Sequence, residues 1–340
     1  MDLKLLEELC LSGGPSGFED EVMGIVMDEL KDHSADLNID VMGNITGFKK
    51  GESYTKTKLL LSAHMDEVGF IVNYITDDGF LKFSTIGGIS PLVLCGKKVL
   101  VGKNKIPGVI GLKPVHLVKQ KDECENVPNA DELCIDVGAK DREDAENSVN
   151  IGDFAVFDSI FQVQGSSIIS KALDDRVGCA LLVEFIKKKS PFDFFFSFSA
   201  QEEIGLRGAK AASYRINPDA AIVLEATTAC DILGVKDEKK VCVLGDGPVL
   251  TYMDKTTVYS REYLNLANNL AKENKVKVQM KRLVSGGNDS GAIHVSRSGI
   301  KTISISLPCR YLHSAFSVID LEDLKETERL LQLLFEAILR

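Results

Sequence analysis

The stretch that most constrains the fold runs from Pro191 to Gly205, where a phenylalanine-rich run leads directly into two adjacent acids, Glu202 and Glu203. A run this short and this aromatic predicts a strand buried on both faces. In open α/β sheets, ligands bind beyond the carboxyl ends of the strands, which is where these acids would lie. Neighbouring buried carboxylates repel each other unless a cation or a shared proton offsets the repulsion. The pair therefore predicts a metal site.

Other apolar, strand-like runs also end in, or lead to, side chains that bind metals. Across the chain these side chains are His64, Glu202, Glu203, Glu225 and His313, with Asp174 at the start of a predicted helix. Each has an ordinary structural explanation, since a lone histidine is usually structural and acids often cap helices. Five such places from distant parts of the chain, with Glu202 and Glu203 counted as one, favour one shared site.

The ligand types narrow the choice of metal. Two imidazoles with several carboxylates suit Zn²⁺, Co²⁺ or Mn²⁺ and are too rich in nitrogen for Ca²⁺ or Mg²⁺. Five ligands, one of them bridging, would hold two ions about 3.5 to 4 Å apart, as in two-metal hydrolases. We therefore expect two divalent metal ions per chain.

The sequence pattern of residues 69–161 differs from that of the rest of the chain. They read as short strands and turns, beginning with a hairpin at 69–75 and 80–83 and closing with runs at 154–157 and 161–163. The sequence predicts a small β-barrel-like domain, 69–161, inserted into an α/β domain formed by 1–68 and 162–340. The charged segment 119–132 is predicted to be a loop of the inserted domain.

Composition excludes several classes of partner. The 340 residues are 44% hydrophobic and 26% charged, as in ordinary globular proteins, and the net charge of −10 disfavours nucleic acid and anionic membranes. No apolar run approaches the roughly 20 residues needed to span a bilayer. The acidic, amphipathic beginning differs from a signal peptide, and eight scattered cysteines without a CxxC pair favour reduced thiols. We expect a cytoplasmic protein.

Four motifs resemble those of the TET-type dinuclear metalloaminopeptidases, metallopeptidase family 42. They are HMDEVG at 64–69, ALDDR at 172–176, QEEIG at 201–205 and RYLHS at 310–314. Further similarity at 15–19, 40–44, 113–116 and 286–289 extends the resemblance over nearly the whole chain in order. It implies an α/β catalytic domain of the zinc-exopeptidase type, with a mixed sheet sandwiched by helices. It also implies that the inserted β-domain mediates dimerisation and that dimers assemble into a hollow dodecamer.

The resemblance also implies a set of metal ligands. His64 and His313 would each bind one metal ion, Asp174 would bridge both, and Glu203 and Glu225 would complete the two coordination shells. The sequence departs from the family at one of these positions, because the family generally has aspartate where this chain has Glu225.

Further roles follow from the same resemblance. Glu202 would be the general base, and Asp66 would support His64. The peptide bond between Asp174 and Asp175 is expected to be cis. His116, in the inserted domain, is expected to be structural, with a reach into a neighbouring active site as the alternative.

These expectations describe an aminopeptidase that releases N-terminal residues from peptides through a water activated by two metals. Two alternatives stay open. An endoglucanase-type glycoside hydrolase also uses paired carboxylates, although this chain has no tryptophan for a sugar platform and its histidines would be idle. A non-catalytic metal-binding scaffold would not need Glu202. The native metal and the preferred N-terminal residue are not indicated.

Overall fold

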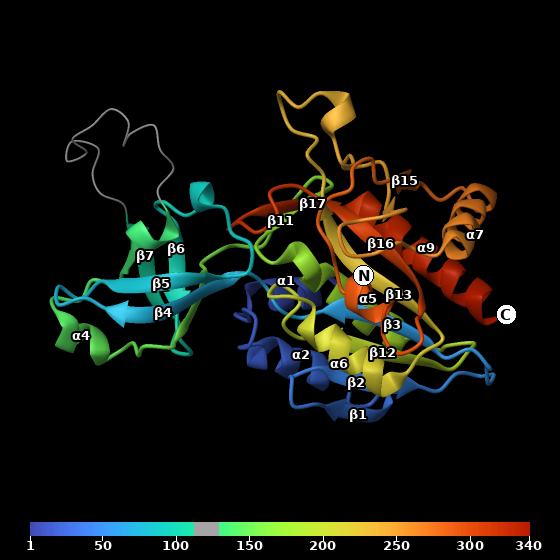
Figure 1. Ribbon diagram of the computed structural model, residues 1–340, viewed down its shortest axis with the longest axis horizontal. Helices are drawn as coiled ribbons and strands as arrows, with labels where there is room; N and C mark the ends of the chain where they lie inside the picture. Colours follow the sequence, from blue (N-terminus) through green and yellow to red (C-terminus); the bar gives the residue numbers. More distant parts are fainter. Residues whose placement is uncertain (112–128) are drawn as a thin grey trace.

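The computed structural model describes residues 1–111 and 129–340, in a large α/β body with a small barrel beside it (Figure 1). His116 and most of the predicted loop at 119–132 lie outside the described residues. The end of that loop forms the short 3-10 helix η3 (Ala130–Glu132). None of the described helices is both long and apolar enough to cross a membrane.

The body is built on an eight-stranded mixed sheet, which confirms the predicted fold class. Its order is β1 (Ala35–Ile39), β2 (Ile45–Lys49), β12 (Phe194–Ser199), β3 (Leu59–His64), β13 (Ala220–Thr228), β16 (Lys301–Cys309), β14 (Val249–Leu250) and β15 (Gln279–Met280). The four strands β12, β3, β13 and β16 run parallel, and β2 and β14 pair antiparallel at either side of them. The carboxyl ends of the parallel strands therefore lie at one edge.

Helices cover both faces of the sheet. Side chains alternate along each strand, so the apolar strands present apolar side chains to both faces, and helices bury them. Leu59 and Leu61 pack on the side of α5, whereas Leu60 packs with α6. The first side carries α1 (Leu3–Leu11), α2 (Asp20–Leu30), α5 (Leu173–Lys187), α7 (Arg261–Glu273) and α9 (Leu321–Leu339), and the second carries α6 (Arg207–Ile216) and α8 (Ser290–Ile293). A short 3-10 helix, η4 (Asp237–Lys239), lies in the connection between β13 and β14.

The phenylalanine-rich run forms β12, as predicted. Phe194, Phe196 and Phe198 are fully buried and pack in a chain of ring contacts, and Phe194 also meets Phe335 of α9 edge-on. Phe195 is half-buried on the other face, against Phe48 of β2. This packing fixes the strand that leads to Glu202 and Glu203.

Six of the strands between β3 and α5 form a closed barrel with its own hydrophobic core. Its strands, in order around the barrel, are β4 (Gly69–Ile75), β5 (Leu81–Ile86), β8 (Cys134–Asp136), β7 (Ile106–Gly111), β6 (Lys98–Val101) and β9 (Phe154–Phe157). The short helices η1 (Pro91–Val93) and α4 (Arg142–Glu146) lie in its connections. Figure 1 shows it joined to the body through the ends of β4 and β5 and the segment after β9.

One strand predicted to close this barrel lies elsewhere. The run at 161–163 forms β10 (Gln162–Gln164), which pairs with β11 (Ser167–Ser170), and β11 pairs with β17 (Ser317–Asp320) in a separate three-stranded sheet. The reason is that β9 already pairs with β4 on one side and β6 on the other, so the barrel offers it no free edge.

The close packing of β2 against β12 makes a stability prediction. A methyl group added at Gly47 would overlap the ring of Phe196, so Gly47→Ala should destabilise the protein by about 1–3 kcal/mol, as overpacked cores do. Gly24 in α2 has open space around it, so Gly24→Ala is the matched control and should be neutral or slightly stabilising. Thermal unfolding followed by circular dichroism measures both, and equal midpoints for the two variants would contradict the predicted overlap.

Candidate metal centre

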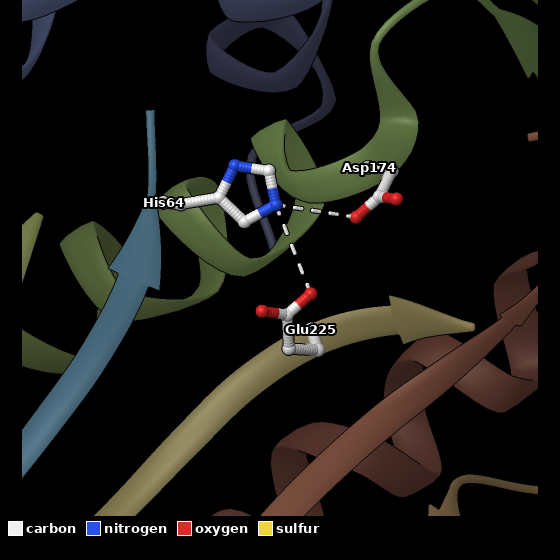
Figure 2. A group of neighbouring side chains, drawn as sticks. All are labelled: His64, Asp174 and Glu225. Atoms are coloured by element: carbon white, nitrogen blue, oxygen red, sulfur yellow. Dashed lines mark ion pairs between the residues drawn. The ribbon is translucent and has the colours of Figure 1, made fainter. Parts of the chain in front are cut away.

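The parallel strands bring His64 and Glu225 together. Val223 of β13 pairs with Ser62 of β3, so Glu225 lies level with His64, the last residue of β3. Figure 2 shows the imidazole of His64 facing both Glu225 and Asp174, which lies at the start of α5, with His64 Nε2 3.4 Å from Asp174 Oδ1 and 3.7 Å from Glu225 Oε2. The sequence prediction that β13 ends at Glu225 is wrong, because the strand continues to Thr228. The sequence prediction ended the strand where the run of apolar residues ends, at the first acid. In the structure, β13 continues because its residues beyond Glu225 still pair with β16.

A second group forms around the other oxygen of Asp174. Its Oδ2 lies 3.5 Å from His313 Nε2, and Glu203 Oε1 lies 3.1 Å from the same nitrogen. The other ring nitrogen of His313 is 2.8 Å from the carbonyl oxygen of Gly88, in the connection between β5 and η1. Asp174 thus faces one imidazole with each carboxylate oxygen.

The two groups fit metal ions. In each of them, His64–Asp174–Glu225 and Asp174–Glu203–His313, one ligand atom from each residue lies within 4.8 Å of the others. Asp174 Oδ1 and Glu225 Oε1 are buried without a hydrogen-bond partner among the described residues, and leaving such atoms unsatisfied is costly. A divalent cation would supply the missing partner, and nitrogen with carboxylate oxygen is the donor set of Zn²⁺, Co²⁺ or Mn²⁺.

The charges at the site are strongly coupled. Burial raises the pKa of Glu225 and Glu202 well above the usual range of a glutamate. Burial alone would lower the pKa of His313, but hydrogen bonds and charges from Asp174 and Glu203 raise it to about 11. Protons therefore balance the negative charge that cations would otherwise balance, so metal binding would release protons.

Asp66 fixes the adjacent glutamates more directly than it orients the imidazole. Its Oδ1 accepts the backbone N–H of Glu202 at 2.9 Å, and its Oδ2 accepts that of Glu203 at 3.0 Å and the hydroxyl of Ser16 at 2.5 Å. Its Oδ1 is 3.5 Å from His64 Nδ1, whereas its own carbonyl oxygen is 3.1 Å from that nitrogen. With Nδ1 donating to this carbonyl, Nε2 faces Asp174 as a lone pair.

Glu202 and Glu203 differ in position. Glu203 belongs to the second group of possible ligands, whereas Glu202 belongs to neither group among the described residues. Both line the same pocket, so Glu202 stands beside the candidate ligands without being one of them.

Two buried acids support the site through contacts that the sequence did not indicate. Asp175, joined to Asp174 by the expected cis peptide bond, accepts the backbone N–H of His64 at 3.3 Å and that of Gly178 at 3.1 Å. Asp289, at the start of α8, accepts the hydroxyl of Ser199. Both acids lie within motifs of the resemblance, but only their burial shows that they support the site from behind.

A buried charge cluster holds the segment that carries Asp174. Glu67 receives hydrogen bonds from Lys171 Nζ at 2.6 and 2.8 Å and lies 3.3 Å from Arg176 Nη2, and all three side chains are at most 3% exposed. Lys171 and Arg176 flank residues 172–175, so the cluster clamps both ends of that short segment. No apolar pattern in the sequence indicates this contact, because its members are about a hundred positions apart.

Comparisons with known proteins show the family to which this chain belongs. The family model of M42 glutamyl aminopeptidases matches residues 43–330. A lysyl aminopeptidase of Pyrococcus furiosus is 31% identical, covering 99% of this chain and 97% of its own. A glutamyl aminopeptidase of Lactococcus lactis subsp. cremoris is also 31% identical, covering 93% of this chain and 91% of its own.

Solved structures show the same fold. A TET aminopeptidase from a marine sediment Thaumarchaeota archaeon superposes with a TM-score of 0.93 at 34% identity, covering 98% of this chain and 95% of its own. The TET1 peptidase of Pyrococcus horikoshii, described as assembling into a tetrahedron or a large octahedral shell, gives 0.85 at 33% identity and 98% coverage of both chains. A Thermotoga maritima structure titled endoglucanase gives 0.80 at 34% identity, covering 97% and 96%.

The charge cluster makes a prediction about stability and metal content. Glu67→Ala leaves Lys171 and Arg176 buried without a carboxylate partner among the described residues, which typically costs about 3–5 kcal/mol in the free energy of unfolding. The variant should also bind less metal, because Asp174 loses its fixed position. Glu262→Ala, which breaks only an exposed pair with Lys301, is the control and should change neither quantity appreciably. Urea unfolding and elemental analysis measure them, and similar losses in both variants would refute the clamp.

Proposed function

Because the chain belongs to the M42 glutamyl aminopeptidase family, we propose that it is a dinuclear metalloaminopeptidase with Glu202 as its general base. The observation that carries the proposal is the position of Asp174, whose two carboxylate oxygens face two separate imidazole–carboxylate groups. His64 and Glu225 would hold one ion, His313 and Glu203 the other, and Asp174 both. The ions proposed are Zn²⁺, Co²⁺ or Mn²⁺.

The metal ions and the protein side chains would contribute different parts of the hydrolysis. Two divalent cations held by these residues would supply a water of lowered pKa, a Lewis acid for the peptide carbonyl and an anchor for the free α-amine of the substrate. Glu202, beside the ligands but in neither group, takes the proton of the attacking water and passes it to the departing amine. Burial raises the pKa of Glu202, so its carboxylate takes up a proton more readily than an exposed one would.

Substituting glutamine for Glu202 or for Glu203 can separate the roles of these two residues. Glu202→Gln should keep two metal ions per chain yet lose at least about 10² in kcat, the low end of a general base's contribution. Glu203→Gln should lose metal and activity together. Elemental analysis beside kcat on aminoacyl 4-nitroanilides decides the matter.

Two outcomes would contradict these roles. Full activity in Glu202→Gln would mean that another group is the base. Loss of metal from Glu202→Gln alone would mean that the two roles are reversed. Assaying a soluble cellulose in parallel tests the endoglucanase alternative, and a stable metal complex without turnover on either substrate class would indicate a scaffold.

We further propose that the inserted domain, 69–161, mediates dimerisation and that dimers assemble into a dodecamer. Its described surface exposes the large apolar side chains of Tyr74, Leu92 and Ile151, and such side chains favour an interface when they cluster. The Pyrococcus horikoshii TET1 peptidase, described as forming a tetrahedron or an octahedral shell, supports this assembly.

The assembly predicts a large particle in solution. Light scattering with excess Co²⁺ should give about twelve times the chain mass of 37.2 kDa. Chelation should shift the population towards dimers, because ligands from distant segments couple site occupancy to domain order. A monomer in excess metal would overturn the assembly, and a profile unchanged by exhaustive dialysis against chelator would overturn its link to metal.

A further inference from the structure

The pocket that contains the candidate metal ligands also contains one lysine. The pocket has a volume of about 400 Å³, and its lining includes His64, Glu225, His313 and Lys281. Among the described residues, Lys281 is the only lysine or arginine in this lining. It directly follows β15, and its backbone N–H donates to the carbonyl of Leu250 at 2.8 Å, so the sheet fixes its position.

The Lys281 ammonium has unused hydrogen-bonding capacity. It donates to the carbonyl oxygen of Ser285 at 2.7 Å, its one hydrogen bond with the described residues, although an ammonium has three donors. Among the described residues, the charges of Asp254 and Glu225 act on this ammonium, but neither carboxylate accepts a hydrogen bond from it. Burial lowers the pKa of Lys281 from its usual value, and the charges of Asp254 and Glu225 offset only part of this effect, so the ammonium is partly removed from water.

The other charges that line the pocket are already engaged. Asp254 is buried, and its two oxygens accept hydrogen bonds from Thr256, from the backbone of Thr257 and from the hydroxyl of Tyr259 at 2.6–2.9 Å. The remaining acids are Glu202 and the candidate metal ligands. Lys281 is therefore the charge in this pocket that is free to meet a substrate.

We propose that Lys281 binds the side chain of the substrate's first residue and selects acidic ones, glutamyl or aspartyl. The inference rests on the proposed aminopeptidase function, because the metal groups would hold the free α-amine and leave the rest of the pocket to that side chain. An ammonium pairs with a carboxylate through a charge-assisted hydrogen bond and repels a second ammonium. The pocket lining also includes Val93, Val241 and Leu312, which suit the methylenes of a glutamyl side chain.

Family membership does not decide this point by itself. The two relatives at 31% identity are a lysyl and a glutamyl aminopeptidase, which act on residues of opposite charge. The choice between them has to come from residues of this chain's own pocket. Lys281 favours the acidic choice.

The experiment compares glutamyl, glutaminyl, leucyl and lysyl 4-nitroanilides with the full-length enzyme in Co²⁺. For the unmodified enzyme, kcat/KM for the glutamyl substrate should exceed that for its near-isostere glutaminyl by at least about tenfold, because a charge-assisted contact is stronger than a neutral one. In Lys281→Met this ratio should collapse towards one, chiefly through KM. Lys281→Arg should retain an acidic preference.

The matched control is Lys210→Met, which removes an exposed lysine of α6 outside the pocket lining and should leave the ratio unchanged. Equal kcat/KM for glutamyl and glutaminyl substrates in the unmodified enzyme, or an unchanged ratio in Lys281→Met, overturns the inference while leaving the proposed function intact. Absence of hydrolysis on every aminoacyl substrate would instead overturn the proposed function. The ratio for the unmodified enzyme needs no variant, so misfolding of Lys281→Met cannot hide the result.

Discussion

The site depends on the parallel register of β3, β12 and β13. His64 pairs with Ser199, the last residue of β12, and Glu225 lies level with His64. Side chains alternate between the faces of a sheet, so a slip of one residue would turn a ligand towards the opposite core. The register is protected because Leu59 and Leu61 must pack on one side and Leu60 on the other. The hydrophobic core thus sets the geometry of the polar centre.

A second requirement is that carboxylates stay ordered where they repel one another. Backbone N–H groups satisfy part of this need, as Asp66 shows by accepting those of Glu202 and Glu203. Buried cations satisfy another part, since Lys171 and Arg176 offset Glu67 beside the segment that carries Asp174. Neither device involves a candidate ligand's own side-chain oxygens. The ligand atoms therefore stay available to metal ions.

Sequence reasoning succeeded where a local pattern has one physical meaning. The phenylalanine-rich run predicted β12 correctly. The hairpin pattern at 69–75 and 80–83 predicted β4 and β5 of the barrel correctly. The predictions were wrong where pairing between strands sets the length or the place of a strand. Thus β13 continues beyond Glu225, and β10 pairs with β11 outside the barrel. The hydrogen bonds that Asp175 accepts and the unused donors of the Lys281 ammonium could not be predicted either. Both are defined by partners, present or missing, that only the folded chain brings near.

The charge balance of the pocket connects the two proposals. Five carboxylates line it, namely Asp174, Glu202, Glu203, Glu225 and Asp254, and together they would repel an acidic substrate side chain. Two divalent cations would balance the first four of these groups, and hydrogen bonds from Thr256, Thr257 and Tyr259 already engage Asp254. Lys281 is then the charge that such a side chain would meet. Selection of an acidic residue then requires the same ions that the hydrolysis requires. A pocket that lost its metals would lose both its reaction and its preference for acids.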